Sequence, residues 1–430
     1  MRLERREVFD FMPLIIGPND YLRPRSRFRV ERSLLIPLLI LASILAEASS
    51  VAAAQAGSIG QLQKGWEVTF KGRLQDATFL ESRGLVVNFY DSDKGKPHYK
   101  LVTSEGRVVT QGEGAIRDVS RGRARILGSF GVQDTPTGEQ LSNNPIGKKG
   151  TVVVSNLGGD VRAVHPEFLG LVPKRPFLRV FSSDGNQIAD LTELVEDLFP
   201  GSPLQTGLAF RVIFTDPNNL VIAGGTSSGS LVALIRIDEK KVAWRHDSED
   251  ANSVWPTLLF GRARLIVYQR LAKKSRKSPS HWGNLCAYSF SGTMEWCIED
   301  ENSLQHFKIS ESGNYLAALA RTGPNDADTS LRVISGDSGE TLWEASSVGR
   351  PIAVSEEAGN VYTIEIQQSD GGQLFPKTFA ELPLDGSAGK QFGFPVLTEG
   401  VHHWHTYYVP DSKTLILLTA SKVIGFSTAQ

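Results

Sequence analysis

The sequence predicts an all-β protein, a single β-propeller with seven four-stranded blades, or eight blades as the alternative. Three observations predict this fold. Two kinds of two-strand hairpin alternate along the chain, successive hairpins of one kind mostly recur at the length of a blade, and each end of the chain carries a strand without a partner. A repeat of about 40–50 residues that holds four strands is typical of propeller blades.

The composition is that of an ordinary globular protein. Of 430 residues, 40% are hydrophobic and 22% are charged, which is enough apolar surface to bury a core. Lys and Arg number 46 against 47 Asp and Glu, a formal net charge of −1. Because the chain has no overall positive field, we expect no binding to nucleic acid, and an acidic partner would need a local basic patch.

Residues 1–56 are predicted to be a leader and signal peptide, and residues 57–430 the propeller. Five arginines between Arg23 and Arg32 precede an apolar run at residues 33–45. The run is shorter than the ~20 residues that span a bilayer and fits the ~7–15 of a signal-peptide core. Ala54 and Ala56 then form an A-x-A cleavage site. We therefore expect an exported protein, periplasmic or secreted. The alternative is an uncleaved membrane anchor.

One kind of hairpin is clearest in LRVISGDSGETLWEA, residues 331–345, where a turn at Gly339 is followed four residues later by Trp343. Gly292 and Trp296 repeat this spacing, and Trp244 lies four residues after Lys240. Copies without the tryptophan have their turns near Gly106, Gly185 and Gly389. Each is predicted to be the outer pair of strands of one blade, with the tryptophans in a packing role.

The second kind of hairpin supplies the inner strands. Seven are recognised, and their turns lie near Gly84, Gly122, Asn218, Arg262, Gly313, Gly359 and Lys413. The later separations (262−218=44, 313−262=51, 359−313=46, 413−359=54) match a blade, whereas one interval is double length (218−122=96). That interval holds a strand candidate, GTVVVSNLGGDVRAV, and a candidate short helix, LTELVEDLF. Seven blades with an elaborated second blade are predicted.

The two ends of the chain are predicted to close the ring. The last inner hairpin is followed by one strand, in SKVIGFSTAQ, and the segment QLQKGWEVTF, with Gly65 and Trp66, supplies an orphan strand near the start. If the two pair, main-chain hydrogen bonds complete the last blade and no edge stays bare. Deletion of residues 65–70 is therefore expected to destabilise the whole domain.

The pattern [ST]-G-x-x-x-W, at Ser338-Gly339-Trp343 and Ser291-Gly292-Trp296, resembles the quinoprotein-like (PQQ-type) propeller repeats, including those of outer-membrane-assembly scaffold lipoproteins. The inner hairpins are similar to the turns of WD40-type and TolB-type propellers. These resemblances imply a propeller and carry no chemistry. Quinone-dependent dehydrogenases of this kind use adjacent cysteines under the cofactor, and here the two cysteines lie eleven apart (297−286=11). No cofactor is therefore expected.

The sequence contains no local catalytic motif. The glycine-rich run at residues 224–230 lacks the P-loop lysine and leads into a strand, and there is no G-x-S-x-G elbow. In VHHWHTYY, His403 and His405 share one face of a strand and are the candidate metal ligands, although the sequence identifies no third donor. No catalytic or metal site is predicted, and the histidines are expected at the surface or rim.

Cys286 and Cys297 predict a disulfide. A two-residue loop that pairs Phe290 with Thr293 also places residue 286 opposite 297. Directly opposed residues have Cα atoms about 4.5–5.5 Å apart, a span that a disulfide can bridge. Export would favour oxidation. Such a loop makes the cysteines a hydrogen-bonded pair, the less favourable register, so a reduced pair is the alternative.

Loop lengths indicate which face of the disc binds a partner. The second-to-third loops and the interblade connections are long and charged, and binding residues usually lie on such loops. The most basic one, residues 271–282, supplies the candidate binding residues Lys273, Lys274, Arg276, Lys277, His281 and Trp282. A solvated insertion without a partner is the alternative for this loop.

The sequence therefore predicts an exported, non-catalytic binding or scaffold module. We expect it to be monomeric and to bind a protein or an acidic polymer on this face, with membrane contact only if the leader stays uncleaved. The competing predictions are a propeller hydrolase or lyase acting on a peptide or glycan, and an anchored extracytoplasmic sensor. Ionisable side chains that converge on the central channel would favour an enzyme.

Overall fold

The computed structural model describes residues 59–80, 84–120, 125–135, 137–146, 151–166, 177–199, 210–226, 229–248, 257–261, 264–270, 283–300, 303–321, 329–346, 348–369 and 371–428. They belong to one compact unit, Val51–Gln430. The predicted leader and cleavage site lie outside the described residues, so export stays a prediction. No helix in the described ranges is long and apolar enough to cross a membrane.

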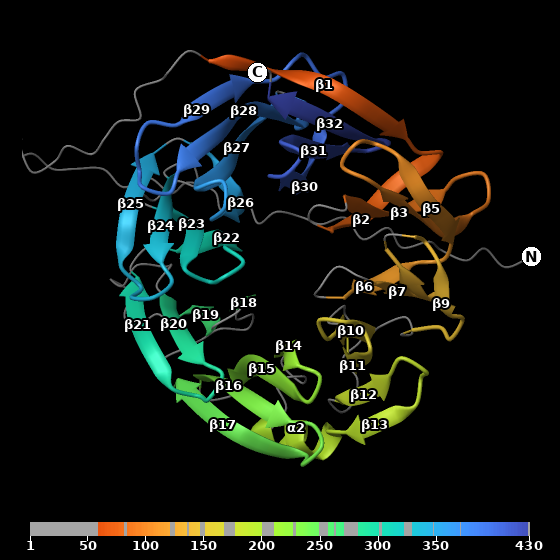
Figure 1. Ribbon diagram of the computed structural model, residues 1–430, viewed down its shortest axis with the longest axis vertical. Helices are drawn as coiled ribbons and strands as arrows, with labels where there is room; N and C mark the ends of the chain where they lie inside the picture. The colour runs from red at the N-terminus through yellow and green to blue at the C-terminus, as the bar shows by residue number, and fades with distance from the viewer. Residues whose placement is uncertain are drawn as a thin grey trace, which may run out of the picture. The chain divides into compact units, whose positions relative to one another are not determined.

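The described strands form seven hydrogen-bonded sheets, six of four strands and one of eight. Within a four-stranded sheet the strands follow one another in chain order, each antiparallel to the last. Figure 1 shows them arranged radially around a ring, with the first strand of each innermost. The eight-stranded sheet consists of two such units, β26–β29 and β30–β32 with β1, so the described strands make eight blades of four.

The first four blades and the one helix bounded in this region have the following limits. Blade 1 is β2 (Gly72–Phe79), β3 (Leu85–Asp91), β4 (Lys96–Val102) and β5 (Val108–Glu113); blade 2 is β6 (Ile116–Val119), β7 (Arg125–Gly128), β8 (Gly131–Asp134) and β9 (Gln140–Ser142); blade 3 is β10 (Thr151–Ser155), β11 (Val161–Pro166), β12 (Arg179–Ser182) and β13 (Gln187–Asp190), followed by α2 (Thr192–Leu198); blade 4 is β14 (Phe210–Asp216), β15 (Asn219–Thr226), β16 (Gly229–Arg236) and β17 (Lys241–Ser248).

The other four blades complete the ring. Blade 5 is β18 (Thr257–Phe260), β19 (Arg264–Arg270), β20 (Gly283–Ser289) and β21 (Met294–Asp300); blade 6 is β22 (Leu304–Ile309), β23 (Tyr315–Arg321), β24 (Thr329–Ser335) and β25 (Thr341–Ser346); blade 7 is β26 (Arg350–Ser355), β27 (Asn360–Gln368), β28 (Leu374–Pro383) and β29 (Lys390–Gly393); blade 8 is β30 (Val401–Val409), β31 (Thr414–Thr419), β32 (Lys422–Thr428) and β1 (Gly60–Thr69).

The core lies between the blades. The described buried apolar side chains form eight clusters, and each cluster joins two adjacent blades. Central strands supply most of them because both of their faces are covered: all six residues of β31 are buried. Outer strands alternate instead, as in β17, where exposed and half-buried residues take turns. The eight clusters confirm the propeller and give its number of blades independently of the sheets.

The predicted number of seven blades is corrected to the alternative of eight. The double-length interval holds the missing inner hairpin, β10–β11, at the strand candidate that the sequence placed in an elaborated second blade. Its turn is closed by Asn156, whose backbone N–H donates to the Val161 carbonyl (2.9 Å) and whose Oδ1 accepts from the Val161 N–H (3.1 Å). The interval of 96 residues is therefore two blades.

Four repeated tryptophans each join one blade to the next. Every one of these indoles donates to a backbone carbonyl in the outer turn of the following blade: Trp66 to Ser104 (2.7 Å), Trp244 to Phe290 (3.2 Å), Trp296 to Gly336 (2.8 Å) and Trp343 to Leu384 (2.8 Å). The ring covers that turn's glycine: a Cβ at Gly339 would lie 2.7 Å from the Trp296 ring. The glycine and the tryptophan of the repeat thus serve two different interfaces, which confirms the packing role.

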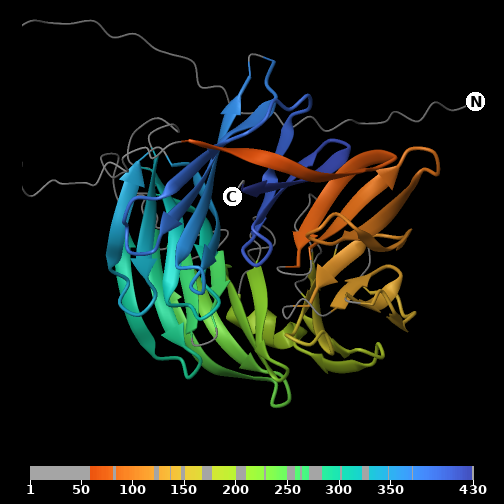
Figure 2. The ribbon, with the colours of Figure 1, turned by 45° about the horizontal axis from the view of Figure 1, so that its top comes forward.

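The predicted closure of the ring is confirmed. β1 pairs antiparallel with β32 from Leu62↔Thr428 to Thr69↔Lys422, and its first residues also pair in parallel with β29, at Gly60↔Phe392. Figure 2 shows β1, in red to orange, running from the blue strands of blade 7 toward blade 1. Strand β1 therefore completes blade 8 and links it to blade 7.

Candidate functional site

We call the side of the ring that carries the second-to-third loops and the interblade connections the long-loop face, and the opposite side the short-turn face. The predicted binding residues on the long-loop face lie outside the described residues: Lys273, Lys274, Arg276, Lys277, His281 and Trp282. Their role stays a prediction. The loop between β3 and β4 joins the second and third strands of blade 1, so it lies on this face, and its residues are described.

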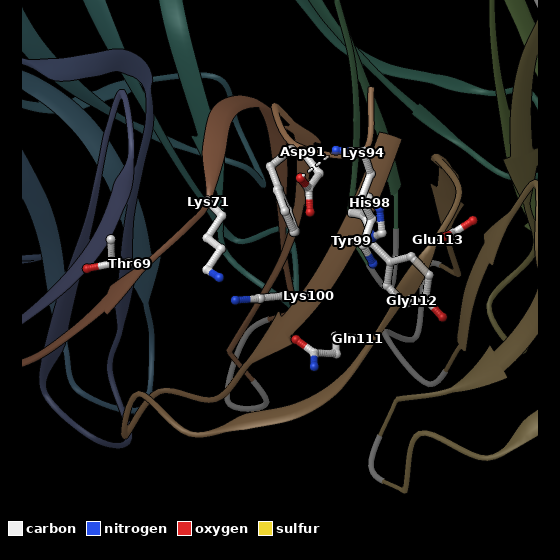
Figure 3. Close-up of a pocket in the computed structure, with 11 residues that line it drawn as sticks. Thr69, Lys71, Asp91, Lys94, His98, Tyr99, Lys100, Gln111, Gly112 and Glu113 are labelled. Carbon is white, nitrogen blue, oxygen red and sulfur yellow. Dashed lines mark hydrogen bonds between the residues drawn. The ribbon is translucent and has the colours of Figure 1, made fainter. Parts of the chain in front are cut away.

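A cavity of about 490 Å³ lies on the long-loop face at blade 1 (Figure 3). It is bounded by the connection from β1 to β2, the β3–β4 loop and the end of β5. Its lining residues are Thr69, Lys71, Phe89, Asp91, Lys94, His98, Tyr99, Lys100, Gln111, Gly112 and Glu113. In Figure 3, Lys71 and Lys100 point toward one another from different segments of the chain.

The β3–β4 loop that forms one wall is fixed by its own aspartate. Asp91 Oδ1 accepts the backbone N–H groups of Asp93 (2.9 Å) and Lys94 (3.1 Å), an Asx turn. Burial works against the charged carboxylate, but these N–H donors hold the pKa of Asp91 below its usual value. These bonds favour the ionised carboxylate, and Asp91 Oδ1 stabilises the conformation of the loop.

The lysines of the cavity carry unbalanced charge. The Lys100 Nζ lies 4.8 Å from the centroid of the Phe70 ring and 5.6 Å from that of Phe89, close enough for cation–π attraction. Burial lowers the pKa of Lys100. No carboxylate of the described residues lies within ion-pair distance of Lys71, Lys94 or Lys100. The cavity therefore favours an anion.

Two aromatic residues of β4 line the cavity. His98 stacks on Phe89 with ring centroids 5.7 Å apart and is 7% exposed. Its Nε2 is buried without a hydrogen-bond partner among the described residues. Tyr99 stacks on Phe130 (4.2 Å) and lies against Gly112, where a Cβ would meet its hydroxyl at 2.7 Å. Gly112 is therefore required for this packing.

Ionisable side chains from three innermost strands form a second cluster, around a bulge in β30. Val401 pairs with Thr419 and Thr406 with Leu417, so residues 402–405 face the single residue between those partners. Bulges of this kind re-aim side chains and occur next to active sites. The bulge carries the predicted histidines.

His405 is the centre of this cluster. Its Nε2 lies 3.7 Å from Asp76 Oδ1, and its Nδ1 lies 3.1 Å from the Tyr407 hydroxyl, which itself donates to the Ala77 carbonyl (2.8 Å). Burial lowers the pKa of His405, and Asp76 opposes that shift. The pKa of His402 is lowered by burial and by Arg73. Both histidines are thus held toward the neutral form.

An arginine from blade 7 adds positive charge to the cluster. Arg350 donates from Nη2 to the Thr406 hydroxyl (3.3 Å), and burial lowers its pKa to about 10. The side chain of His403, one of the two predicted metal candidates, lies outside the described residues. Among the residues that are described, no group of three or more His, Cys, Asp or Glu side chains could hold a metal ion.

Cys286 and Cys297 form a disulfide between β20 and β21, with Cα atoms 4.0 Å apart. The predicted pairing of the two cysteines is confirmed, but the predicted two-residue loop is wrong. The Ser289 N–H donates to the Thr293 carbonyl, and the register shifts by one residue before the turn. The short Cα spacing is that of a non-hydrogen-bonded pair, about 4.5 Å, rather than the expected hydrogen-bonded one.

The comparisons with known proteins identify the fold. No protein-family model and no curated protein sequence matches the chain. Among solved structures, the Dos1 propeller matches with a TM-score of 0.50 and 12% identity over 86% of this chain and 96% of that one. BamB from Moraxella catarrhalis has a TM-score of 0.48 and 11% identity, over 85% of this chain and 99% of that one. The β-propeller domain of Cps50 (Swd1) from Myceliophteria thermophila has a TM-score of 0.45 and 10% identity, over 86% of this chain and 100% of that one. At these identities the likeness is one of fold. The match to the Dos1 propeller supports the predicted β-propeller fold.

The sequence did not single out the residues of the cavity. Asp91, Lys94 and His98 lie in a loop that was expected on the binding face, but Lys71 and Lys100 are separated from it in sequence and carry no motif. The available signal was local: Lys100 on an apolar strand, between a tyrosine and a leucine. A charged residue in a strand whose neighbours are buried indicates a special environment.

Proposed function

We propose that this chain is an exported, non-catalytic β-propeller that binds a partner protein through its long-loop face. The observation that carries the proposal is the cavity on this face, whose three lysines make no ion pair with a described carboxylate. Charged groups without partners on a rigid scaffold are features of interaction surfaces. The predicted basic residues of the loop at 273–277 lie outside the described residues and are tested by a separate variant.

Export is supported by three sequence features and one disulfide. The arginine-rich segment, the apolar run and the A-x-A site form a signal-peptide pattern. The Cys286–Cys297 disulfide is the kind of bond that persists outside the reducing cytoplasm. We therefore propose a periplasmic or secreted monomer. Mass spectrometry of the mature N-terminus distinguishes cleavage from an anchored sensor.

The partner site is tested by charge reversal on opposite faces. Lys71→Glu/Lys94→Glu alters the cavity, and Lys241→Glu/Lys413→Glu is the matched control, because all four lysines are exposed and the control pair lies on the short-turn face. Partners are captured by in-cell crosslinking and identified by mass spectrometry. We expect the first variant to lose partners that the wild type and the control retain, at an unchanged melting temperature.

A third variant reverses the four basic residues of the loop at 273–277. Because exposed charges are screened beyond about 8–10 Å at physiological ionic strength, binding through either patch should weaken as salt is raised. Equal capture by the wild type and both long-loop variants would place the partner site elsewhere on the disc and refute the proposal.

A second candidate function, an enzyme, is favoured by the cluster around His405. A histidine between a carboxylate and a tyrosine hydroxyl has the composition of a general-base site. The test is turnover of peptide and glycan substrates by the wild type and by His405→Asn. Turnover that disappears in this variant, with the fold intact, would replace the scaffold proposal by an enzyme. Lack of turnover in the wild type supports the scaffold.

A further inference from the structure

The cavity at blade 1 differs from an ordinary basic surface in the way its charges are distributed. Its two acidic residues already have partners: Glu113 accepts from Lys96 at 3.3 Å, and Asp91 accepts two backbone N–H groups. None of its three lysines makes an ion pair with a described carboxylate, and only Lys94 is attracted to Asp91 at longer range. The lining therefore carries three lysines against two carboxylates, a formal excess of one positive charge (3−2=1).

We infer that this cavity is an anchor pocket for the carboxylate of an acidic segment of the partner protein, with Lys71 and Lys100 as the charged contacts. The inference rests on the proposed function and names the chemistry that its site would recognise. Lys71 comes from the β1–β2 connection and Lys100 from β4, and the two point toward one another across the cavity (Figure 3). A carboxylate between them would accept hydrogen bonds from two ammonium groups.

The surroundings of Lys100 explain why a ligand carboxylate would stabilise it. Burial and the adjacent aromatic rings remove water from the ammonium group, and its pKa is lowered as a result. Attraction to the ring faces replaces only part of the lost hydration. An opposite charge within about 4–6 Å favours the charged lysine, so binding of the carboxylate and protonation of Lys100 reinforce each other.

The shape of the cavity favours a side chain over a free ion. The Phe89 ring lines the same cavity as the lysines and offers an apolar surface to the methylene groups of a glutamate. Gln111, at the end of the cavity on β5, adds an amide that can donate to a second oxygen. A volume of about 490 Å³ accommodates one acidic residue and its neighbours.

The test is fluorescence anisotropy with a labelled glutamate-rich octapeptide and its glutamine counterpart as probes. The proteins are the wild type, Lys100→Gln and the matched control Lys241→Gln on the short-turn face. We expect the wild type and the control to bind the glutamate peptide, Lys100→Gln to bind it at least about tenfold more weakly, and the glutamine peptide to bind to none. Lys71→Gln should give a similar loss. Because Lys71 is exposed, that variant keeps the test valid if Lys100→Gln does not fold.

Several outcomes would overturn the inference: no binding of the glutamate peptide, equal binding by the lysine variants, equal binding of the glutamine peptide, or displacement of the peptide by inorganic phosphate below millimolar concentration. NMR of the lysine ammonium groups gives a second readout, because the pKa of Lys100 should rise when the peptide binds. If the long-loop variants lose crosslinked partners but Lys100→Gln binds the peptide as tightly as the wild type, the proposed function survives and the anchor pocket is refuted. If Lys100→Gln loses peptide binding but the long-loop variants capture the same partners as the wild type, the pocket is supported and the proposed function fails.

Discussion

Substitution of Trp66 by alanine should loosen the closure of the ring. Trp66 lies on β1, donates from Nε1 to the Ser104 carbonyl at 2.7 Å, and packs on Gly106 of blade 1 and on Gly425 of β32. Strand β1 is held to blade 8 by main-chain hydrogen bonds and side-chain packing, because the chain connects it only to blade 1. The indole is therefore a principal contact that keeps blades 8 and 1 together.

The expected cost follows from the burial of the indole. Replacement of a fully buried tryptophan by alanine costs about 3–5 kcal/mol, and a half-buried ring about half of that. The lost hydrogen bond adds roughly 1 kcal/mol. We therefore expect a free energy of unfolding about 3 kcal/mol lower. For a unit of the size of Val51–Gln430, an unfolding entropy of about 2 cal/mol/K per residue converts this loss into a melting temperature about 4 °C lower.

Differential scanning calorimetry and hydrogen exchange measure the two effects. Trp343→Ala is the control, since Trp343 makes the same contact between blades 6 and 7 (2.8 Å to the Leu384 carbonyl). Blades 6 and 7 are each built from four consecutive strands, so neither depends on a strand from the other end of the chain. Both variants should melt earlier, but only Trp66→Ala should speed amide exchange in β1 and β32 at temperatures below melting. Exchange in β1 as slow as in the wild type would refute the idea that Trp66 holds the closing strand.

Three further predictions test other parts of the structure. Gly339→Ala should be more destabilising than Gly359→Ala by roughly 1–3 kcal/mol in urea unfolding, because both glycines have positive φ (78° and 65°) but only at Gly339 would a Cβ strike a ring, 2.7 Å away; equal losses would show that the ring can move aside. Burial holds the pKa of His402 and of His405 in the folded protein below 6.5, so the unfolded chain binds more protons near that pH. The free energy of unfolding should therefore fall as the pH drops through about 6.5 and level off below the folded pKa values. The double variant to glutamine should flatten this pH dependence, and a slope equal to that of the wild type would contradict the prediction. Thiol titration of the denatured, unreduced protein should detect no free thiol, and two free thiols would exclude the Cys286–Cys297 bond.

The repeats that carry tryptophan were predictable from the sequence because one side chain and one glycine recur at fixed spacing. Blades 2 and 3 use other residues at the same interface. Thr110 packs on Gly138, where a Cβ would lie 2.9 Å from the threonine Cβ, and Asn144 donates to the Asp184 carbonyl at 2.8 Å. Smaller side chains make the same kind of contact without a recognisable pattern. The eighth blade was therefore hidden in the double-length interval.

The cavity was less predictable than the blades. Whether its lysines can act together on one ligand depends on their distances and burial, and these depend on how β1, β3, β4 and β5 pack in space. The sequence indicated the face, since long loops follow from strand order, but it did not indicate which charges on that face lack partners. The histidines of β30 illustrate the same limit: alternation along a regular strand predicted a shared face for His403 and His405, whereas the bulge at residues 402–405 interrupts that alternation.

The pairing of β1 with β32 joins residues that are 366 positions apart (428−62=366). Synthesis finishes seven blades before the eighth can receive its outermost strand, so the ring must wait for its final segment and should close slowly. During that wait β1 has no partner and is open to the β32 edge of any neighbouring copy. Exchange of β1 between two chains would satisfy every hydrogen bond of the closed ring, which makes this strand the expected exchanged element of domain-swapped dimers at high concentration, with residues 70–71 as the hinge.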